Sequence, residues 1–260
     1  MLFKNKYLPI PSRWLVAFAA VAMITGCATS KPEGPVDRQA LGGAIAIDDV
    51  TFVRARVEAK SLTVNDNASG IGYAAAPMIT VAAHNASLNV LRYLIAAKAD
   101  VNARTPDRDT AIMLAALFRD DDRERSSASA LRYDQAVRML AEAGASLENA
   151  ESNAYTPLAY AAYAGREQAL SYLLEKGAKV NGTAQGRVAL VNTPLMMAAM
   201  QGHRTAALLL LRAGADANVR VRNGMTALEF ALKHKHTHLE KILRCAESLK
   251  PGETFRTRCE

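Results

Sequence analysis

The sequence predicts an all-α solenoid of about five helix–turn–helix repeats, preceded by a degraded N-terminal cap. A closely similar segment recurs at a fixed spacing: Pro77 to Thr110 and Thr193 to Thr226 each span 33 residues. Two intervals are longer, with 46 residues from Thr110 to Thr156 and 37 from Thr156 to Thr193. Each unit has room for two short helices and a turn. Because such a unit cannot bury its own apolar side, the units must stack on one another.

Each unit carries residues suited to its place in a helix pair. Thr156 and Thr193 can cap a helix N-terminus, and each is followed by a proline, which fits the first helical turn. Small alanine pairs in the first helix let neighbouring units approach closely. Leucine pairs fill the space between layers, and glycines follow the second helix, where a left-handed backbone favours glycine. These positions are Ala161-Ala162, Ala198-Ala199, Leu173-Leu174, Leu209-Leu210, Gly144, Gly177 and Gly214.

Over residues 76–244 the chain resembles the ankyrin repeat family. The segments "TPLAYAAYAG" and "TPLMMAAMQGH", with "LSYLLEKGAKVN" and "LLLRAGADAN", recur in phase with the 33-residue period of that family. The resemblance implies an ankyrin-repeat solenoid over residues 76–247. It also implies that the finger tips and the exposed side of the first helices bind partner proteins.

Both ends of the solenoid need polar covers. The segment "DDVTFVRARVEAKSLTVN" (Asp48–Asn65) resembles the second helix and exit of a degraded repeat, so residues 44–75 are predicted to form an N-terminal cap. Lys233 to Arg244 is heavily charged, as a closing repeat should be, and residues 248–260 form a C-terminal tail.

The first 26 residues are predicted to be a cleaved signal peptide. Basic residues precede an apolar run from Trp14 to Ile24 that is too short to span a bilayer comfortably. The sequence Ile24-Thr25-Gly26-Cys27 resembles the lipobox of bacterial lipoproteins, which implies acylation of Cys27, including a palmitate-type chain. The alternative is a plain secretory leader with a chance cysteine.

The lipobox resemblance further implies a lipid anchor in a Gram-negative envelope. Two or more acyl chains hold a protein stably on a membrane. Ala28, where an aspartate usually retains such proteins in the inner membrane, implies the outer membrane, periplasmic side. Residues 27–43, rich in Pro, Gly and polar residues, are predicted to be a flexible tether.

The charge balance argues against nucleic acid as a partner. The leader holds three of the 32 basic residues and no acidic one, which leaves 29 basic against 25 acidic side chains, a net charge of +4. Contact with the membrane is therefore expected through the lipid anchor only.

Two segments depart from the repeat pattern. Residues 119–132 form an insertion in the second repeat, predicted to be a charged loop or helix extension. A partner-specific protrusion is the alternative, and the acidic spacing does not match an EF-hand calcium loop. The second segment, Asn181 to Asn192, is an enlarged finger. Its Val188, Leu190 and Val191 are either covered by a ligand or folded back.

Histidines and cysteines gather near the C-terminus. His236 aligns with His203 in the turn between helices, which breaks a helical His234–His238 pair, so no metal site is predicted. Cys245 and Cys259 form an even pair in an oxidising compartment and are predicted to form a disulfide that holds the tail onto the last helix. Two reduced cysteines are the alternative.

Catalytic motifs are not apparent in the sequence. It holds no Gly-x-Ser-x-Gly elbow, phosphate-binding Gly-rich loop, Cys-x-x-Cys or His-Glu-x-x-His. We therefore expect a binding protein without a cofactor rather than an enzyme.

Transfer of the family's binding positions onto this chain predicts a protein-binding surface rich in aromatic residues and methionine. Such residues are favoured anchors of protein interfaces, and finger arginines favour an acidic partner. Alternatively, Leu117 and Phe118 pack under the insertion and the other residues form ordinary surface. The predicted residues are Leu117, Phe118, Tyr155, Tyr163, Met200, Gln201, Met225, Arg220 and Arg222, with Arg104, Arg108 and Arg187 as further finger arginines.

The expected function is binding of a partner protein in the periplasm. Ankyrin-like lipoproteins of Gram-negative bacteria include immunity proteins that neutralise secreted phospholipase-type effectors, so such an effector is a possible partner implied by the resemblance. The alternative is an envelope scaffold or stress-protection protein acting on a resident periplasmic enzyme.

Overall fold

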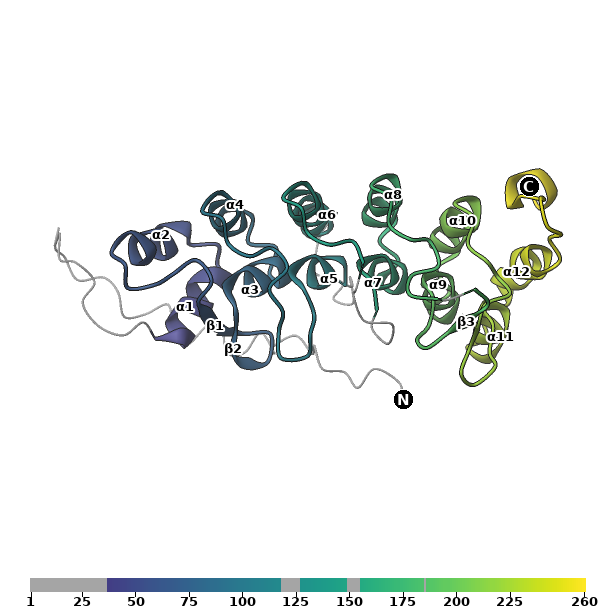
Figure 1. Ribbon diagram of the computed structural model, residues 1–260, viewed down its shortest axis with the longest axis horizontal. Helices are drawn as coiled ribbons and strands as arrows, with labels where there is room; N and C mark the ends of the chain where they lie inside the picture. Colours follow the sequence, from purple (N-terminus) through teal and green to yellow (C-terminus); the bar gives the residue numbers. More distant parts are fainter. Residues whose placement is uncertain (1–36, 118–126, 149–154, 185) are drawn as a thin grey trace.

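The chain folds into one elongated solenoid of paired helices in two rows. In this computed structural model, residues 37–117, 127–148, 155–184 and 186–260 are described. The first helices of the pairs form one row and the second helices the other (Figure 1). The first row comprises α1 (Arg38–Ala46), α3 (Met78–His84), α5 (Ala111–Ala116), α7 (Pro157–Ala164), α9 (Pro194–Gln201) and α11 (Ala227–Lys233). The second row comprises α2 (Val50–Glu58), α4 (Leu88–Ala96), α6 (Ser127–Glu142), α8 (Glu167–Glu175), α10 (Arg204–Arg212) and α12 (Glu240–Glu247), the last preceded by a 3-10 turn at Thr237–Leu239.

Strands are confined to the fingers between pairs. β1 (Asn67–Gly70) and β2 (Tyr73–Pro77) form an antiparallel hairpin with Asn67 opposite Pro77. β3 (Val188–Ala189) and β4 (Arg220–Val221) belong to successive fingers and pair in parallel. The predicted all-α solenoid of five helix pairs plus a cap is confirmed.

The helix starts follow the predicted threonine pattern. The Thr156 hydroxyl accepts a hydrogen bond from the Ala159 N–H and the Thr193 hydroxyl one from the Met196 N–H, each at 3.3 Å. A proline occupies the first turn of both helices. At eight residues each, α7 and α9 have only about two turns and are too short to be stable alone, so these caps fix where each helix begins while packing stabilises it.

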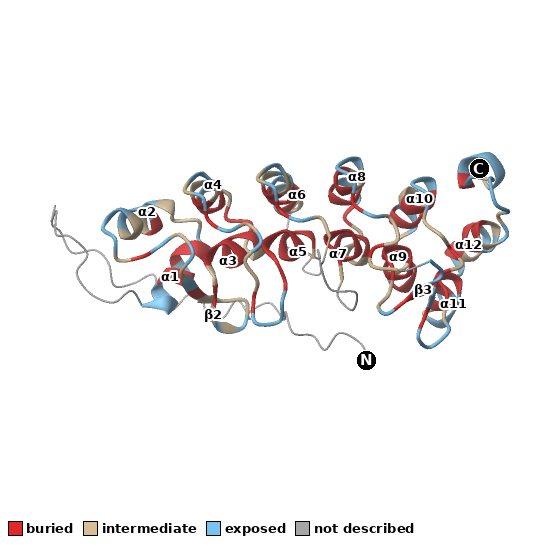
Figure 2. Cartoon of the chain, in the orientation of Figure 1, coloured by how far each residue is buried: buried red, intermediate tan, exposed pale blue. Residues whose placement is uncertain are grey.

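The first helices pack side by side through alanine. α7 lies between α5 and α9, and α9 in turn contacts α11. The pairs Ala161-Ala162 and Ala198-Ala199 are fully buried at these contacts. The row of first helices is accordingly the most buried part of the chain (Figure 2). Methyl side chains let the helix backbones approach, so the alanine pairs set the spacing of the stack.

Side chains at the start of the second helices tie each repeat to the preceding one. The His203 ring nitrogen bonds the Tyr163 carbonyl and the His236 ring nitrogen bonds the Met200 carbonyl, both at 3.1 Å. Ser87 occupies the equivalent position and donates to the Ile45 carbonyl at 2.6 Å. The predicted equivalence of His203 and His236 is therefore confirmed.

The glycine before His203 has a steric reason. Gly202 has φ of +77°, and a Cβ there would lie 2.6 Å from the His236 ring of the next repeat. A larger residue would therefore meet backbone strain and a clash that breaks the tie.

At the N-terminus the structure corrects the predicted boundary between tether and cap. Helix α1 begins at Arg38 and is capped by the Asp37 carboxylate, so residues 38–43 belong to the fold and the tether prediction was wrong there. The Gly42-Gly43 pair suggested a linker. Instead, a Cβ on Gly42 would lie 1.8 Å from the Ser69 carbonyl oxygen, so glycine permits α1 to pack against β1.

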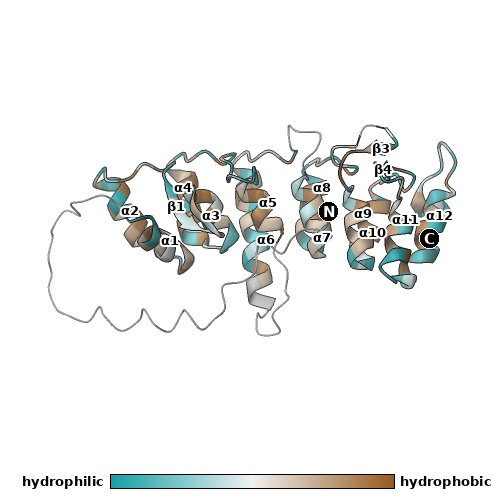
Figure 3. Cartoon of the chain, turned by 90° about the horizontal axis from the view of Figure 1, so that it is seen from below, coloured by the Kyte–Doolittle hydropathy of each residue, from teal (hydrophilic) through white to brown (hydrophobic). Residues whose placement is uncertain are grey.

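The insertion lengthens a second helix. α6 begins at Ser127, inside residues 119–132, and extends beyond the neighbouring helices (Figure 3). The Arg132 guanidinium donates to the Ala86 carbonyl at 2.9 Å and pairs with Asp48 at 3.2 Å. The later part of the insertion therefore braces the second repeat against the first and the cap. The acidic residues considered for calcium, 120–124, lie outside the described residues.

The insertion also changes the tie between repeats. The Tyr133 hydroxyl in α6 donates to the His84 carbonyl at 2.8 Å, where the other repeats use the residue before the second helix. Arg166, at the histidine position of the next repeat, forms a buried ion pair with Asp134 at 2.7 Å. The stack thus keeps its connections with different side chains.

A disulfide holds the C-terminal tail. Cys245 in α12 and Cys259 are bonded, with Cα atoms 5.9 Å apart. The short helix α13 (Phe255–Arg258) packs against α10 and α12 and buries Phe255, which is 3% exposed. Arg212 of α10 also pairs with Glu260 at 2.6 Å. The tail therefore covers the end of the solenoid.

We expect Cys259→Ser to lower the free energy of unfolding by about 2–4 kcal/mol, because the bridge no longer restricts the unfolded chain. Urea denaturation of a chain that starts at residue 28, where Cys245 and Cys259 are the remaining cysteines, measures this. The double variant Cys245→Ser/Cys259→Ser should be no less stable than the single one. Two free thiols per wild-type chain in denaturant without reductant would contradict the bridge.

Candidate protein-binding surface

Four tyrosines gather where the first fingers meet helix α7, and we refer to them as the tyrosine cluster: Tyr73, Tyr155, Tyr160 and Tyr163. Tyr73 lies in β2, Tyr155 precedes α7, and the other two lie in α7. The rings of Tyr155 and Tyr160 meet edge to face, with centroids 6.0 Å apart. Such a contact fixes the orientation of both rings.

Two carboxylates of the second finger anchor the tyrosine cluster. The Tyr160 hydroxyl donates to the buried Asp109 carboxylate at 2.8 Å, and the Tyr73 hydroxyl donates to Asp107. The Asp109 N–H in turn donates to the Thr105 hydroxyl at 3.1 Å. The cluster therefore joins three successive repeats through hydrogen bonds to one finger.

Burial keeps these hydroxyls protonated. Desolvation raises the pKa of Tyr160 far above its usual value, and the neighbouring Asp109 charge raises it further. Burial also raises the pKa of Tyr155, with a smaller effect from Tyr163. Both phenols are thus neutral hydrogen-bond donors at physiological pH.

Three of the predicted binding residues are partly exposed in the structure. Tyr155, Tyr163 and Gln201 are half-buried, so part of each side chain faces solvent. Met225, before α11, is also half-buried. Leu117 caps the C-terminus of α5 and packs against the core, while Phe118 lies outside the described residues.

The structure corrects the prediction for Met200. It was predicted to be an exposed anchor but is 7% exposed and belongs to the core. It lies in α9 between two neighbouring first helices, and its carbonyl receives the His236 tie. Neighbouring repeats cover the flexible side chain, so it contributes packing rather than binding.

Three of the finger arginines, Arg187, Arg220 and Arg222, lie farther along the solenoid, whereas Arg104 and Arg108 belong to the second finger. Arg220 donates to the Gly224 carbonyl at 2.6 Å and approaches Glu229 at 3.7 Å. Arg187 approaches Asp216 at 3.6 Å, and Arg222 is exposed. These arginines therefore present positive charge near the third to fifth repeats.

Sequence reasoning missed the role of Tyr160 and Tyr73. Neither residue is among those predicted from sequence, and the positions equivalent to Tyr160 hold Val81, Leu114, Met197 and Phe230. The one signal available was that Tyr160 alone in this series carries a hydroxyl, which needs a partner when buried.

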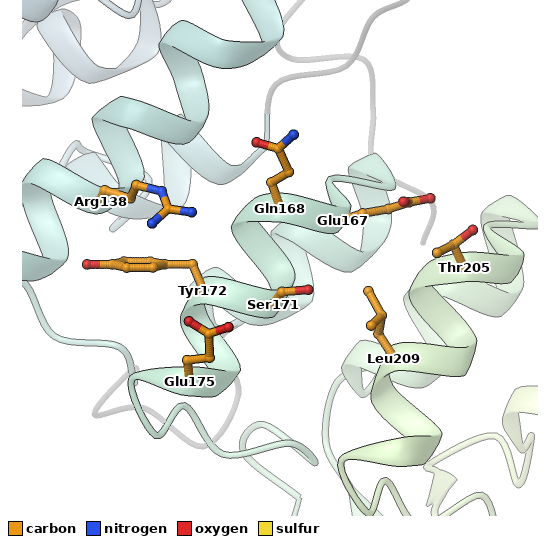
Figure 4. A pocket seen from close by; sticks show the side chains of 8 residues that line it. All are labelled: Arg138, Glu167, Gln168, Ser171, Tyr172, Glu175, Thr205 and Leu209. Atoms are coloured by element: carbon orange, nitrogen blue, oxygen red, sulfur yellow. The ribbon is translucent and has the colours of Figure 1, made fainter. Parts of the chain in front are cut away.

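A groove of about 390 Å³ lies on the opposite side of the solenoid, between second helices (Figure 4). Tyr172 lies there beneath Arg138, whose guanidinium is 4.5 Å from the centroid of the Tyr172 ring. The Tyr172 hydroxyl donates a hydrogen bond to the Glu142 carboxylate at 3.3 Å. These side chains link α6 to α8. The remaining lining residues are Glu167, Gln168, Ser171, Glu175, Thr205 and Leu209.

Two of the C-terminal histidines, His236 and His238, form hydrogen bonds to backbone carbonyls of the preceding repeat. The His238 ring nitrogen bonds the Gly202 carbonyl at 2.9 Å, beside the His236 tie. Within the described ranges, no three His, Cys, Asp or Glu side chains are grouped so as to hold a metal ion. Nor is any described helix long and apolar enough to cross a membrane.

We expect Tyr160→Phe to remove a dependence of stability on alkaline pH. The raised pKa of Tyr160 means that its stabilising contribution is complete below the unfolded pKa near 10 and is lost as pH rises above it, by about 1 kcal/mol per pH unit. Urea unfolding at pH 8 and pH 11 should show a smaller loss for Tyr160→Phe than for the wild type. At pH 8 the variant should already be less stable by roughly 1–3 kcal/mol, because Asp109 loses a buried donor. Equal losses in both proteins would contradict the buried pair.

Comparison with known proteins agrees with this architecture. The family model for ankyrin repeats in three copies matches residues 79–184 and 186–251, and a second for many copies matches residues 158–211. No curated protein matches the chain. Ankyrin repeat proteins are typically non-enzymatic modules for protein–protein interaction, and no catalytic family is indicated. The matches cover most of the chain, which therefore belongs to the ankyrin repeat family.

Proposed function

We propose that this protein is a lipid-anchored periplasmic binding protein that captures a partner through the tyrosine cluster. The observation that carries the proposal is the tyrosine cluster, in which Tyr73, Tyr155 and Tyr163 are partly exposed around the buried Tyr160. The hydroxyls of Tyr73 and Tyr160 are held by Asp107 and Asp109 of one finger. Rings fixed before binding lose little conformational entropy on contact, and tyrosine is enriched among interface hot spots.

The chemistry of the surface favours a partner protein with acidic and hydrogen-bond-accepting groups. Neutral phenol groups can donate to carbonyl or carboxylate oxygens, and the raised pKa of Tyr155 keeps that capacity at alkaline pH. Arg187, Arg220 and Arg222 on the later fingers add positive charge. An acidic protein partner fits both features, and the charge speeds its encounter.

The cellular location rests on the N-terminal sequence. The basic and apolar leader ending in Ile24-Thr25-Gly26-Cys27 supports acylation at Cys27, and Ala28 supports delivery to the outer membrane. The disulfide between Cys245 and Cys259 is suited to an oxidising compartment.

For the partner we propose a secreted phospholipase-type effector, which makes this chain an immunity protein. A binder tethered beside the membrane meets such an enzyme where its lipid substrate lies. An enzyme held at its surface by an ankyrin stack would be kept from that substrate. The alternative function is that of a scaffold for a resident envelope enzyme.

Affinity capture from envelope extract tests the binding surface. We expect a chain of residues 28–260 to retain one acidic protein, and Tyr155→Ala/Tyr163→Ala to reduce its affinity by roughly 2 kcal/mol or more, as for interface hot spots. Arg92→Ala, on the exposed side of α4, is the matched control and should bind normally. Full retention by the tyrosine variant would place binding elsewhere. Capture of a resident enzyme in cells without any effector would favour the scaffold.

Mass spectrometry of the membrane-extracted protein tests the anchor. We expect an N-terminal Cys27 carrying acyl chains, and Cys27→Ser should abolish both the acylation and stable membrane retention, because the mature chain then lacks its lipids. A mature N-terminus at another residue, without lipid, would contradict it.

A further inference from the structure

The fourth and fifth fingers form a small ribbon with two different faces, which we call the finger ribbon: residues 187–190 and 219–222. β3 and β4 pair in parallel with Val188 opposite Arg220 and Ala189 opposite Val221. Figure 3 shows the two strands side by side beyond the ends of α9 and α11. Side chains alternate between the faces, as they do along any strand.

The inner face of the finger ribbon is packed against the protein. Ala189, Val219 and Val221 are buried and belong to the core cluster. The Arg220 N–H donates to the Arg187 carbonyl at 2.9 Å, which ties one finger to the next. The strand pairing and the buried inner face hold the finger ribbon in place. Its outer face is therefore left exposed to solvent.

The outer face combines aliphatic and cationic side chains. Val188 is 61% and Leu190 40% exposed, and both are among the most exposed large apolar residues of the described chain. Arg220 lies on the same face as Val188, which is opposite it in the ribbon, while the exposed Arg222 follows β4 and Arg187 precedes Val188. The side chain of Arg187 is 71% exposed and that of Arg220 57%, although Arg187 pairs with Asp216 at 3.6 Å and Arg220 with Glu229 at 3.7 Å.

This composition differs from that of the tyrosine cluster. The cluster presents aromatic rings held by carboxylates, whereas the finger ribbon presents two aliphatic side chains on a protruding tip flanked by guanidinium groups. Such a tip can enter the headgroup layer of a bilayer, while arginine donates two parallel hydrogen bonds to a phosphate.

We propose that the outer face of the finger ribbon docks on an anionic lipid surface. Val188 and Leu190 enter the boundary between headgroups and acyl chains, and Arg187, Arg220 and Arg222 bind headgroup phosphates. This contact is separate from acylation at Cys27 and adds a second membrane contact to the one expected through the lipid alone. It would orient the solenoid with its fingers toward the membrane.

Vesicle sedimentation with the unacylated chain of residues 28–260 tests the proposal. This chain keeps every helix described above, because the fold begins at Asp37, the cap of α1. We expect it to sediment with phosphatidylcholine vesicles that contain phosphatidylglycerol and not with phosphatidylcholine alone. Raising the salt concentration should weaken binding.

Variants of the finger ribbon make the test specific. Arg220→Gln/Arg222→Gln should weaken vesicle binding about thirtyfold, since each arginine near an anionic surface contributes about fivefold. Val188→Ser/Leu190→Ser should weaken it about tenfold through the loss of buried apolar groups. The charge-matched control Arg92→Gln/Lys241→Gln, on exposed positions of α4 and α12, should bind within about twofold of wild type.

Three results would overturn the proposal. One is wild-type protein that does not bind anionic vesicles while its circular dichroism shows a folded chain. The second is an equal loss of vesicle binding in the finger-ribbon and control variants, which would show that net charge alone causes the binding. The third is finger-ribbon variants that bind anionic vesicles as tightly as the wild type, whether or not they lose an acidic protein partner.

Discussion

The structure depends on the contact between successive first helices. Each helix pair leaves one apolar side that only the next pair can cover, and the buried alanine pairs Ala161-Ala162 and Ala198-Ala199 set how closely the pairs approach. The histidine ties from His203 and His236 then fix the orientation of one repeat on the preceding one. A larger residue in an alanine pair would separate two repeats and release the tie as well. Stacking is thus a property of neighbours and not of any single repeat.

This stacking explains why the binding chemistry lies where it does. A row of helices packed on both sides leaves only the finger side of each first helix uncovered, and the tyrosine cluster occupies that side at α7. Asp109 holds Tyr160 from the preceding finger, so the surface is built from more than one repeat. The insertion in the second repeat is compatible with this arrangement because Tyr133 and Arg166 replace the usual tie. The disulfide-bonded tail covers the last helix pair.

The sequence predicted those features of the fold that depend on residues within a single repeat, and it missed features that depend on contacts between repeats. Threonine caps and glycine turns act within one repeat, so the repeat register and the equivalence of His203 and His236 were predicted correctly. Helix α1 was missed because Gly42 looks like a linker, and its role becomes visible only against Ser69, distant in sequence. Met200 was misplaced because its exposure is decided by two neighbouring helices. The Tyr160–Asp109 hydrogen bond and the parallel pairing of β3 with β4 each join different repeats. No sequence pattern within one repeat predicts such contacts.

Hydrogen exchange of the chain of residues 28–260, resolved by peptide, tests the dependence on neighbours most directly. If each repeat is held by the next, amides of α5, α7 and α9 should exchange slowest and at a common rate set by cooperative opening, with faster exchange toward α1. His203→Ala should then speed exchange in both α7 and α9, since it removes a tie between their repeats. Repeats that exchange at unrelated rates, or a His203→Ala effect confined to α10, would contradict the stacking mechanism.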